Sequence, residues 1–143
     1  MPPPGVKARV DRFWRAVKRL GELASTPKRD FVKNADKVDA AERNLQVAVE
    51  ALIDVGEFII SRMGWETPRS YREVGEILKR HGVLDEELER KYGELVRLRN
   101  IVIHNYVYLT PEEVYEYAGK LRKTLTTLAS KLLGYMADRG LDP

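Results

Sequence analysis

The sequence predicts an all-α fold, an up-and-down helical bundle of four to five helices. Apolar residues recur at three- and four-residue steps along most of the 143 residues, which places them on one face of each helix. No alternation of apolar and polar residues is long enough for a useful β-strand, and no internal repeat is present. With 43% apolar and 33% charged residues, the chain is expected to fold as a single domain over residues 1–143.

The first expected helix covers residues 6–23. Its apolar face comprises Val6, Val10, Phe13, Trp14, Val17 and Leu20. Pro27 interrupts the pattern, so residues 25–38 are expected to form a polar connection that can include a short turn of helix. Residues 1–37 carry ten Lys or Arg against four Asp or Glu, a balance of +6, whereas residues 38–143 carry fifteen against eighteen, a balance of −3. This basic end is either a solvated helix face or a surface for nucleic acid or an acidic partner.

The second expected helix, residues 39–63, is the most apolar part of the chain. Between residues 45 and 60 its polar side chains are Gln46, Glu50, Asp54 and Glu57. Their spacing of four, four and three residues places them on one narrow stripe, and apolar residues cover the remainder. A helix enclosed in this way is expected to be central and to pack on several neighbours. The stripe is then either its solvent-facing edge or the lining of a polar cleft.

Start and stop signals predict the third and fourth helices. Ser70 and Glu73 have the spacing of a capping box, which indicates a short helix over residues 71–80 that Gly82 closes. Asp85 is a suitable N-cap for the fourth helix. The buried face of that helix is expected to comprise Leu88, Tyr92, Leu95, Val96, Leu98 and Val102.

The last expected helix begins at the sequence Thr-Pro-Glu-Glu, residues 110–113. Thr110 would cap it, Pro111 suits the first helical position, and Glu113 would complete a capping box. Its apolar face comprises Val114, Tyr117, Leu121, Leu125, Leu128 and Leu132. The helix is expected to fray by Gly140.

The composition excludes several classes of function and location. Without Cys, the chain has no disulfide framework, no thiolate metal site and no Cys nucleophile. No apolar run approaches the roughly 18 residues of a membrane span, and the first residues lack the apolar core of a signal peptide, so a cytoplasmic location is expected. The two His, His81 and His104, do not have zinc-motif spacing, and no glycine-rich phosphate loop is present. No metal and no cofactor are therefore expected, and His81, beside a helix-ending Gly, is interpreted as structural.

The residues that carry chemistry are concentrated between Arg99 and Tyr106, at the end of the fourth helix. Arg99, His104 and Tyr106 lie within eight residues. Five residues advance a helix by about 500°, so Arg99 and His104 would point about 140° apart. A working site therefore needs either a distortion of the helix near His104 or a second copy of the chain. Asn100, four residues before His104, shares its face and would orient the imidazole.

Each of these residues also has a purely structural interpretation. A single His at a helix end can cap the helix, and Tyr106 could be an ordinary core aromatic. The presence of Arg99, His104 and Tyr106 together at this spacing favours a functional site instead.

This combination resembles the motif of HepT-type toxins in the HEPN superfamily, which is Arg, four to six residues, His, any residue, Tyr. His104 follows Arg99 at the short end of that spacing, and Tyr106 follows His104 after one residue. Further blocks are similar to the family's second and third helices; they are residues 41–46, 53–56, 68–73 and 78–83. The resemblance covers residues from about 39 to 120.

The resemblance implies a metal-independent endoribonuclease toxin that acts as a homodimer, with motif residues of both subunits in one cleft. RNA supplies its own nucleophile, the 2′-OH, so the protein need only move protons and stabilise charge. His104 would serve as general base or acid, because an imidazole titrates near pH 6.5. Arg99 would hold the scissile phosphate and stabilise its extra negative charge. Tyr106 is implied to be the residue to which a partner, an MntA-like nucleotidyltransferase antitoxin, transfers AMP.

Two other functions stay open from the sequence. One is a non-catalytic HEPN subunit that binds substrate for a nucleotidyltransferase, although such subunits tend to lack the full motif that is present here. The other is a plain helical scaffold, which explains the bundle but not the motif. Asp54 and Glu57 are candidates for groups that support the cleft.

Overall fold

The computed structural model describes the backbone of residues 5–104 and 109–141, and the side chains of these ranges except residues 102–104. This part of the chain forms six α-helices and no strand; they are α1 (Lys7–Ala24), α2 (Lys28–Val32), α3 (Ala35–Met63), α4 (Tyr71–Arg80), α5 (Glu86–His104) and α6 (Pro111–Asp138). The predicted all-α class is confirmed. The sixth helix, α2, has five residues and is the short turn of helix expected within the connection of residues 25–38.

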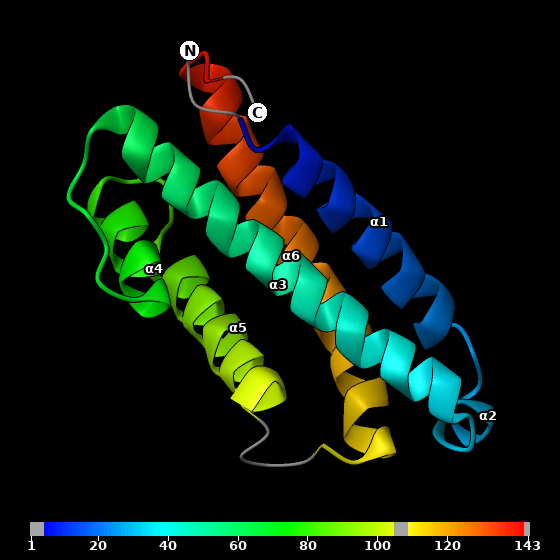
Figure 1. Cartoon of the computed structure of the whole chain (residues 1–143). Coiled ribbons are helices and arrows are strands. Elements are labelled where there is room, and N and C mark those ends of the chain that lie inside the picture. The colour runs from blue at the N-terminus through cyan, green and yellow to red at the C-terminus, as the bar shows by residue number, and fades with distance from the viewer. Residues whose placement is uncertain (1–4, 105–108, 142–143) are drawn as a thin grey trace.

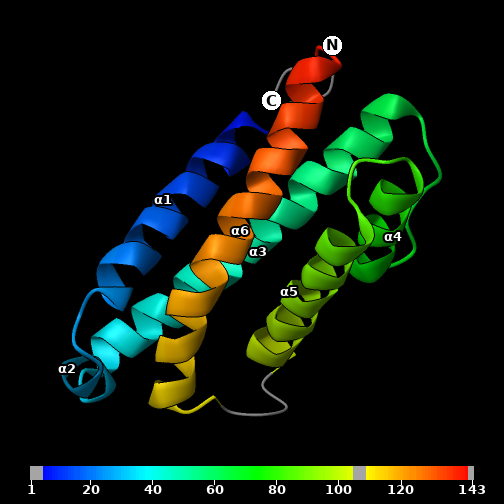
Figure 2. The ribbon, with the colours of Figure 1, turned by 180° about the vertical axis from the view of Figure 1, so that it is seen from behind.

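The central helix is α3, as its nearly continuous apolar surface predicts. It contacts each of the other five helices of the described chain. Figure 1 shows α3 along the front of the molecule, with α1 on one side, α5 on the other and α6 behind. The view from behind places α6 across α3 and sets α4 and α5 together on one side (Figure 2). The start of α1 and the end of α6 lie at the same end of the bundle.

The predicted start signals are confirmed by side-chain hydrogen bonds at three helices. The Ser70 hydroxyl accepts from the Glu73 amide at the start of α4, at 3.1 Å. The predicted capping box is only half formed there, because the Glu73 carboxylate accepts from the amide of Arg69 rather than from that of Ser70. A carboxylate oxygen of Asp85 accepts from the Leu88 amide at 2.8 Å, at the start of α5. At the start of α6, Thr110 and Glu113 form the complete, reciprocal capping box. These bonds satisfy amides that have no partner within their own helix.

The predicted helix ends at Gly82 and Gly140 are confirmed by the backbone conformation. Gly82 follows α4 with φ 80°, and Gly140 follows α6 with φ 66°; Gly64, which follows α3, has φ 69°. This left-handed backbone strains any residue that carries a Cβ, which explains glycine at each helix end.

Among the described side chains, the core follows the apolar faces that periodicity predicted, with an exception in α1. Val102, expected on the buried face of α5, lies outside the described side chains. Phe13 and Leu20 are buried, but Trp14 is 39% exposed. Adjacent residues on a helix point about 100° apart, so Trp14 lies at the margin of the face whose centre includes Phe13. Trp14 instead covers the edge of the Phe13 ring, at a centroid distance of 5.0 Å.

Two glycines allow α4 to approach its neighbours closely. A Cβ on Gly56 of α3 would lie 2.9 Å from Cγ1 of Val74, and a Cβ on Gly75 of α4 would lie 2.5 Å from Cδ1 of Tyr92. These contacts hold α4 against both α3 and α5, beside the stretch that carries the predicted site. In the described chain, no helix is long and apolar enough to cross a membrane.

Candidate active site

The predicted site residues fall at the C-terminal end of α5. Arg99 and Asn100 lie in the helix, and His104 is its last residue. The His104 side chain and all of Tyr106 lie outside the described residues. The helix reaches His104, so the two ways of bringing Arg99 and His104 together, a change of backbone direction there or a second subunit, both stay open.

Arg99 is held from several sides. Its side chain is only 15% exposed, and its Nε lies 3.6 Å from Oε1 of Glu50 on α3. Its guanidinium carbon lies 4.6 Å from the centre of the Tyr71 ring, a cation–π contact with the first residue of α4. Its Nη1 also donates to Oδ1 of Asn100 at 3.2 Å. Within the described residues the Nε is buried and makes no hydrogen bond. Any capacity to bind an anion therefore lies with the N–H groups of Nη1 and Nη2 beyond the one that donates to Asn100.

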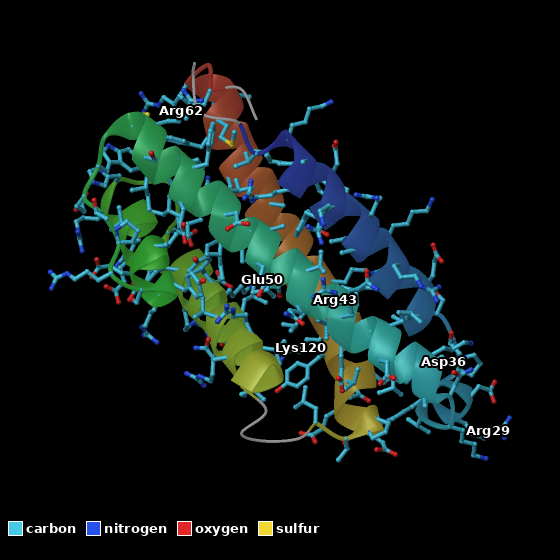
Figure 3. The ribbon with its side chains drawn as sticks, viewed as in Figure 1. Arg29, Asp36, Arg43, Glu50, Arg62 and Lys120 are labelled. Carbon is cyan, nitrogen blue, oxygen red and sulfur yellow. The ribbon has the colours of Figure 1, made fainter. Side chains whose placement is uncertain are left out.

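Two acidic residues of the polar stripe on α3 each pair with an arginine of a neighbouring helix: Glu50 with Arg99 and Asp54 with Arg9. Figure 3 shows Glu50 about midway along α3, on the side that faces α5. One turn further on, Asp54 pairs with Arg9 of α1, and the Arg9 Nε donates to Oδ2 at 2.8 Å. The stripe is therefore partly a solvent-facing edge and partly the floor between α1 and α5, with arginines bound on both sides.

The observed side-chain contact of Asn100 is with Arg99. Its side-chain oxygen accepts the Arg99 bond, which leaves its amide NH₂ for other partners. The predicted contact from Asn100 to the imidazole of His104 stays a prediction.

A groove of about 810 Å³ opens beside these residues, between α3, the loop of residues 64–70 and α5. Asn100 and Val96 line its α5 side, Glu57 and Ser61 its α3 side, and Tyr71 the start of α4. A volume of this size is sufficient for a drug-sized molecule or a nucleotide.

Tyr71 occupies its place because of Tyr92 and the cap of α4. The hydroxyl of Tyr92 donates to the backbone oxygen of Tyr71 at 3.1 Å, while the Tyr92 ring is buried against Gly75. Burial, with smaller effects from the charges of Glu57 and Asp54, raises the pKa of Tyr92 far above its ordinary value. Tyr92 is therefore a neutral hydrogen-bond donor that fixes the wall of the groove.

Glu57 is the carboxylate of the groove. Burial raises its pKa above the ordinary value, and the neighbouring charge of Asp54 raises it further, although Arg9 opposes this. In the part of the chain that the structure describes, Glu57 has neither a hydrogen bond nor an ion pair.

His81 has the structural role that was expected of it. Its ring stacks on Trp65 at a centroid distance of 3.9 Å, and its Nε2 lies 2.7 Å from Oε1 of Glu66. Glu66 also binds Arg80, and a hydrogen bond from its own backbone together with these two partners lowers its pKa to about 2. These contacts tie the loop after α3 to the end of α4. Among the described residues, no group of three or more His, Asp or Glu is arranged to hold a metal ion.

Comparison with known proteins decides the family. The family model described as "Ribonuclease HepT-like" matches residues 14–132. The chain belongs to this family. The HepT-type resemblance that the Arg99–Tyr106 stretch indicated is therefore confirmed at the level of the family.

Characterised HepT-like relatives cover most of the chain. A tRNA nuclease HepT from Aphanizomenon flos-aquae is 23% identical over 115 residues, which are 79% of this chain and 77% of the relative. An mRNA nuclease HepT from Shewanella oneidensis is 30% identical over 101 residues, which are 68% of this chain and 73% of the relative. A tri-AMPylated HEPN toxin of Shewanella oneidensis, solved in complex with its MNT antitoxin, has the same fold. Its TM-score is 0.81 at 21% identity, with 90% of this chain and 96% of that chain covered.

Sequence reasoning missed one residue of the candidate site. Tyr71 was interpreted only as the start of a capped helix, yet its ring covers Arg99. A Tyr at the first position of a helix carries no local signal for such a contact, because the two residues meet only through the packing of α4. Glu50 was recognised as part of a polar stripe, and the structure identifies Arg99 as its partner.

Proposed function

We propose that this chain is a metal-independent endoribonuclease, the toxin of a toxin–antitoxin pair, in which Arg99 and His104 of a homodimer act on RNA in one cleft. The observation that carries the proposal is the state of Arg99. Its guanidinium is nearly buried, is held by Glu50, Tyr71 and Asn100, and lies five residues before His104, with N–H groups on Nη1 and Nη2 beyond the one that donates to Asn100. An arginine fixed in this way is suited to a phosphate, because its donors need no reorganisation when charge develops.

The proposed reaction uses the nucleophile that RNA carries. One His104 accepts the proton of the 2′-OH, and the 2′-oxygen attacks the adjacent phosphorus. Arg99 stabilises the additional negative charge on the phosphoryl oxygens. The bond from phosphorus to the 5′-oxygen then breaks, and that oxygen takes a proton from a second imidazole. The motif contains one His, so the His104 of the second subunit is the proposed donor, which gives dimerisation a chemical role.

Family membership supports ribonuclease activity, and two relatives of this chain are nucleases of tRNA and of mRNA. Because these two substrates differ, neither is carried over to this protein.

Regulation is proposed to act on Tyr106. The solved relative is a tri-AMPylated toxin in complex with an MNT antitoxin, which supports a nucleotidyltransferase as the partner of this chain. Addition of AMP to Tyr106 would place bulk and negative charge two residues after His104, where it would repel an RNA backbone. The proposed location is the cytoplasm, where RNA and such an antitoxin are both present.

The test is RNA cleavage in the presence of EDTA by the wild type, His104→Ala and His81→Ala. Wild type and His81→Ala should cleave, because His81 only stacks on Trp65 and binds Glu66. His104→Ala should lose cleavage by at least about a hundredfold, the usual contribution of a general acid or base. Cleavage that requires a metal ion, or that survives His104→Ala, would contradict the proposal. Binding of RNA without any cleavage by the wild type would instead support the non-catalytic subunit.

A further inference from the structure

The groove beside Arg99 has a composition suited to nucleotides, and two of the residues that contact Arg99 line it. Asn100, which lines it, directly follows Arg99 and accepts a hydrogen bond from it. Tyr71 lines it as well and carries the Arg99 guanidinium on its ring. The groove therefore lies next to the position proposed for the scissile phosphate.

The walls of the groove combine aromatic surface with positive charge. Tyr71 is 40% exposed, an unusual state for a large aromatic residue in this bundle. Trp65 also lines the groove, and Arg69 and Arg72 lie on the same wall. Aromatic rings that stack bases, together with basic groups that follow the backbone, are the usual means of binding single-stranded RNA.

On the opposite side of the groove, Glu57 is a half-buried carboxylate without a donor. No hydrogen bond or ion pair to Glu57 is present among the described side chains, although burial makes its charge costly. A ligand with N–H groups would supply what the protein does not. The position of this carboxylate therefore indicates a base edge rather than a phosphate, which it would repel.

We propose that the groove binds one unpaired nucleotide next to the scissile phosphate, and that Glu57 selects guanine there. The Watson–Crick edge of guanine carries two neighbouring donors, N1–H and N2–H, which one carboxylate accepts together. The corresponding edges of the other three bases offer a carboxylate one donor and at least one repelling acceptor. In a duplex this edge is already paired, so the groove takes single-stranded RNA. The inference rests on the proposed ribonuclease function and names its substrate more closely.

Binding is measured first, with the full chain carrying His104→Ala so that RNA is not cut. The probes are two short fluorescent single-stranded RNAs, uridine runs that contain either one guanosine or one adenosine. The guanosine probe should bind about tenfold more tightly, the discrimination of a good bidentate contact. The added change Glu57→Gln keeps the shape of the side chain but replaces one acceptor with a donor, and it should abolish the difference between the probes. Glu94→Gln, on the exposed side of α5 beside Arg90, is the control and should preserve it.

The cleavage positions in a mixed-sequence single-stranded RNA are then mapped with the active protein. Wild type should cut beside guanosine, and Glu57→Gln should cut with that preference lost, at an unchanged thermal midpoint. The inference is overturned if the probes bind equally, if no RNA binds, or if the guanosine preference survives Glu57→Gln. The proposed ribonuclease function fails on a different result, namely cleavage that survives His104→Ala or is absent in the wild type. The binding measurement does not depend on cleavage, so the two failures can be told apart.

Discussion

A glycine-to-alanine change at Gly75 tests the packing that places Tyr71 over Arg99. In a helix interior alanine is more stable than glycine by about 1 kcal/mol. At Gly75, however, the new Cβ would lie 2.5 Å from Cδ1 and 3.0 Å from Cε1 of the Tyr92 ring. That ring is 2% exposed and is tied by its hydroxyl to the backbone of Tyr71, so it cannot move away freely. Overpacking of this kind costs about 1–3 kcal/mol.

The matched control is Gly119→Ala on α6, where a Cβ would meet nothing within 4 Å. We expect Gly119→Ala to raise the free energy of unfolding by about 1 kcal/mol and Gly75→Ala to lower it by up to about 2 kcal/mol. Urea unfolding followed by circular dichroism measures both. Gly75→Ala should also reduce RNA cleavage, because displacement of Tyr92 releases Tyr71. If both variants gain the same stability, the close contact between α4 and Tyr92 does not exist as described.

Three further predictions concern other parts of the molecule. Glu50→Gln should lower the rate of RNA cleavage by about tenfold or more, because Arg99 loses its charged neighbour and its fixed position. The control is Asp54→Asn, which breaks the similar pair with Arg9 and should change the cleavage rate by no more than about twofold. Glu66 has a pKa lowered from 4.5 to about 2, so its contribution to stability is complete above pH 4.5 and is lost as the pH falls toward 2. The difference in urea midpoint between wild type and Glu66→Gln should therefore shrink as the pH falls from 4.5 to 2. A difference that stays constant would refute the pairing of Glu66 with Arg80 and His81. Tyr106→Phe should remain toxic in cells that also express the cognate nucleotidyltransferase, and its neutralisation there would rule out Tyr106 as the regulated residue.

Local signals in the sequence were sufficient for most of the fold. Caps such as Ser70, Asp85 and Thr110 act within one turn of helix, so they can be recognised without knowledge of the tertiary structure. The apolar surface of residues 45–60 likewise indicated the central position of α3, because a helix that is apolar on nearly all sides must be enclosed. Trp14 departed from its pattern because periodicity does not define where a buried face ends.

The surroundings of the candidate site could not be predicted in the same way. Arg99 meets Glu50 from α3 and Tyr71 from α4, and these contacts depend on how closely three helices pack. The approach of α4 to α3 and to α5 depends on Gly56 and Gly75, whose roles emerge only when the opposing side chains are known. The groove follows from the same packing. By contrast, Arg99 and Asn100 were named as candidates from their spacing to His104, which is local in the chain.

The claim that two subunits share one catalytic cleft is tested most directly by mixing wild type with His104→Ala. The two proteins are combined in equal amounts at constant total concentration, exchanged into mixed dimers by unfolding and refolding, and assayed for RNA cleavage in EDTA. If each cut requires the imidazoles of both subunits, only dimers of two wild-type chains are active, and the mixture should retain about a quarter of the wild-type rate. A rate of about half would show that each chain works alone, and would contradict a cleft shared by the two His104 residues.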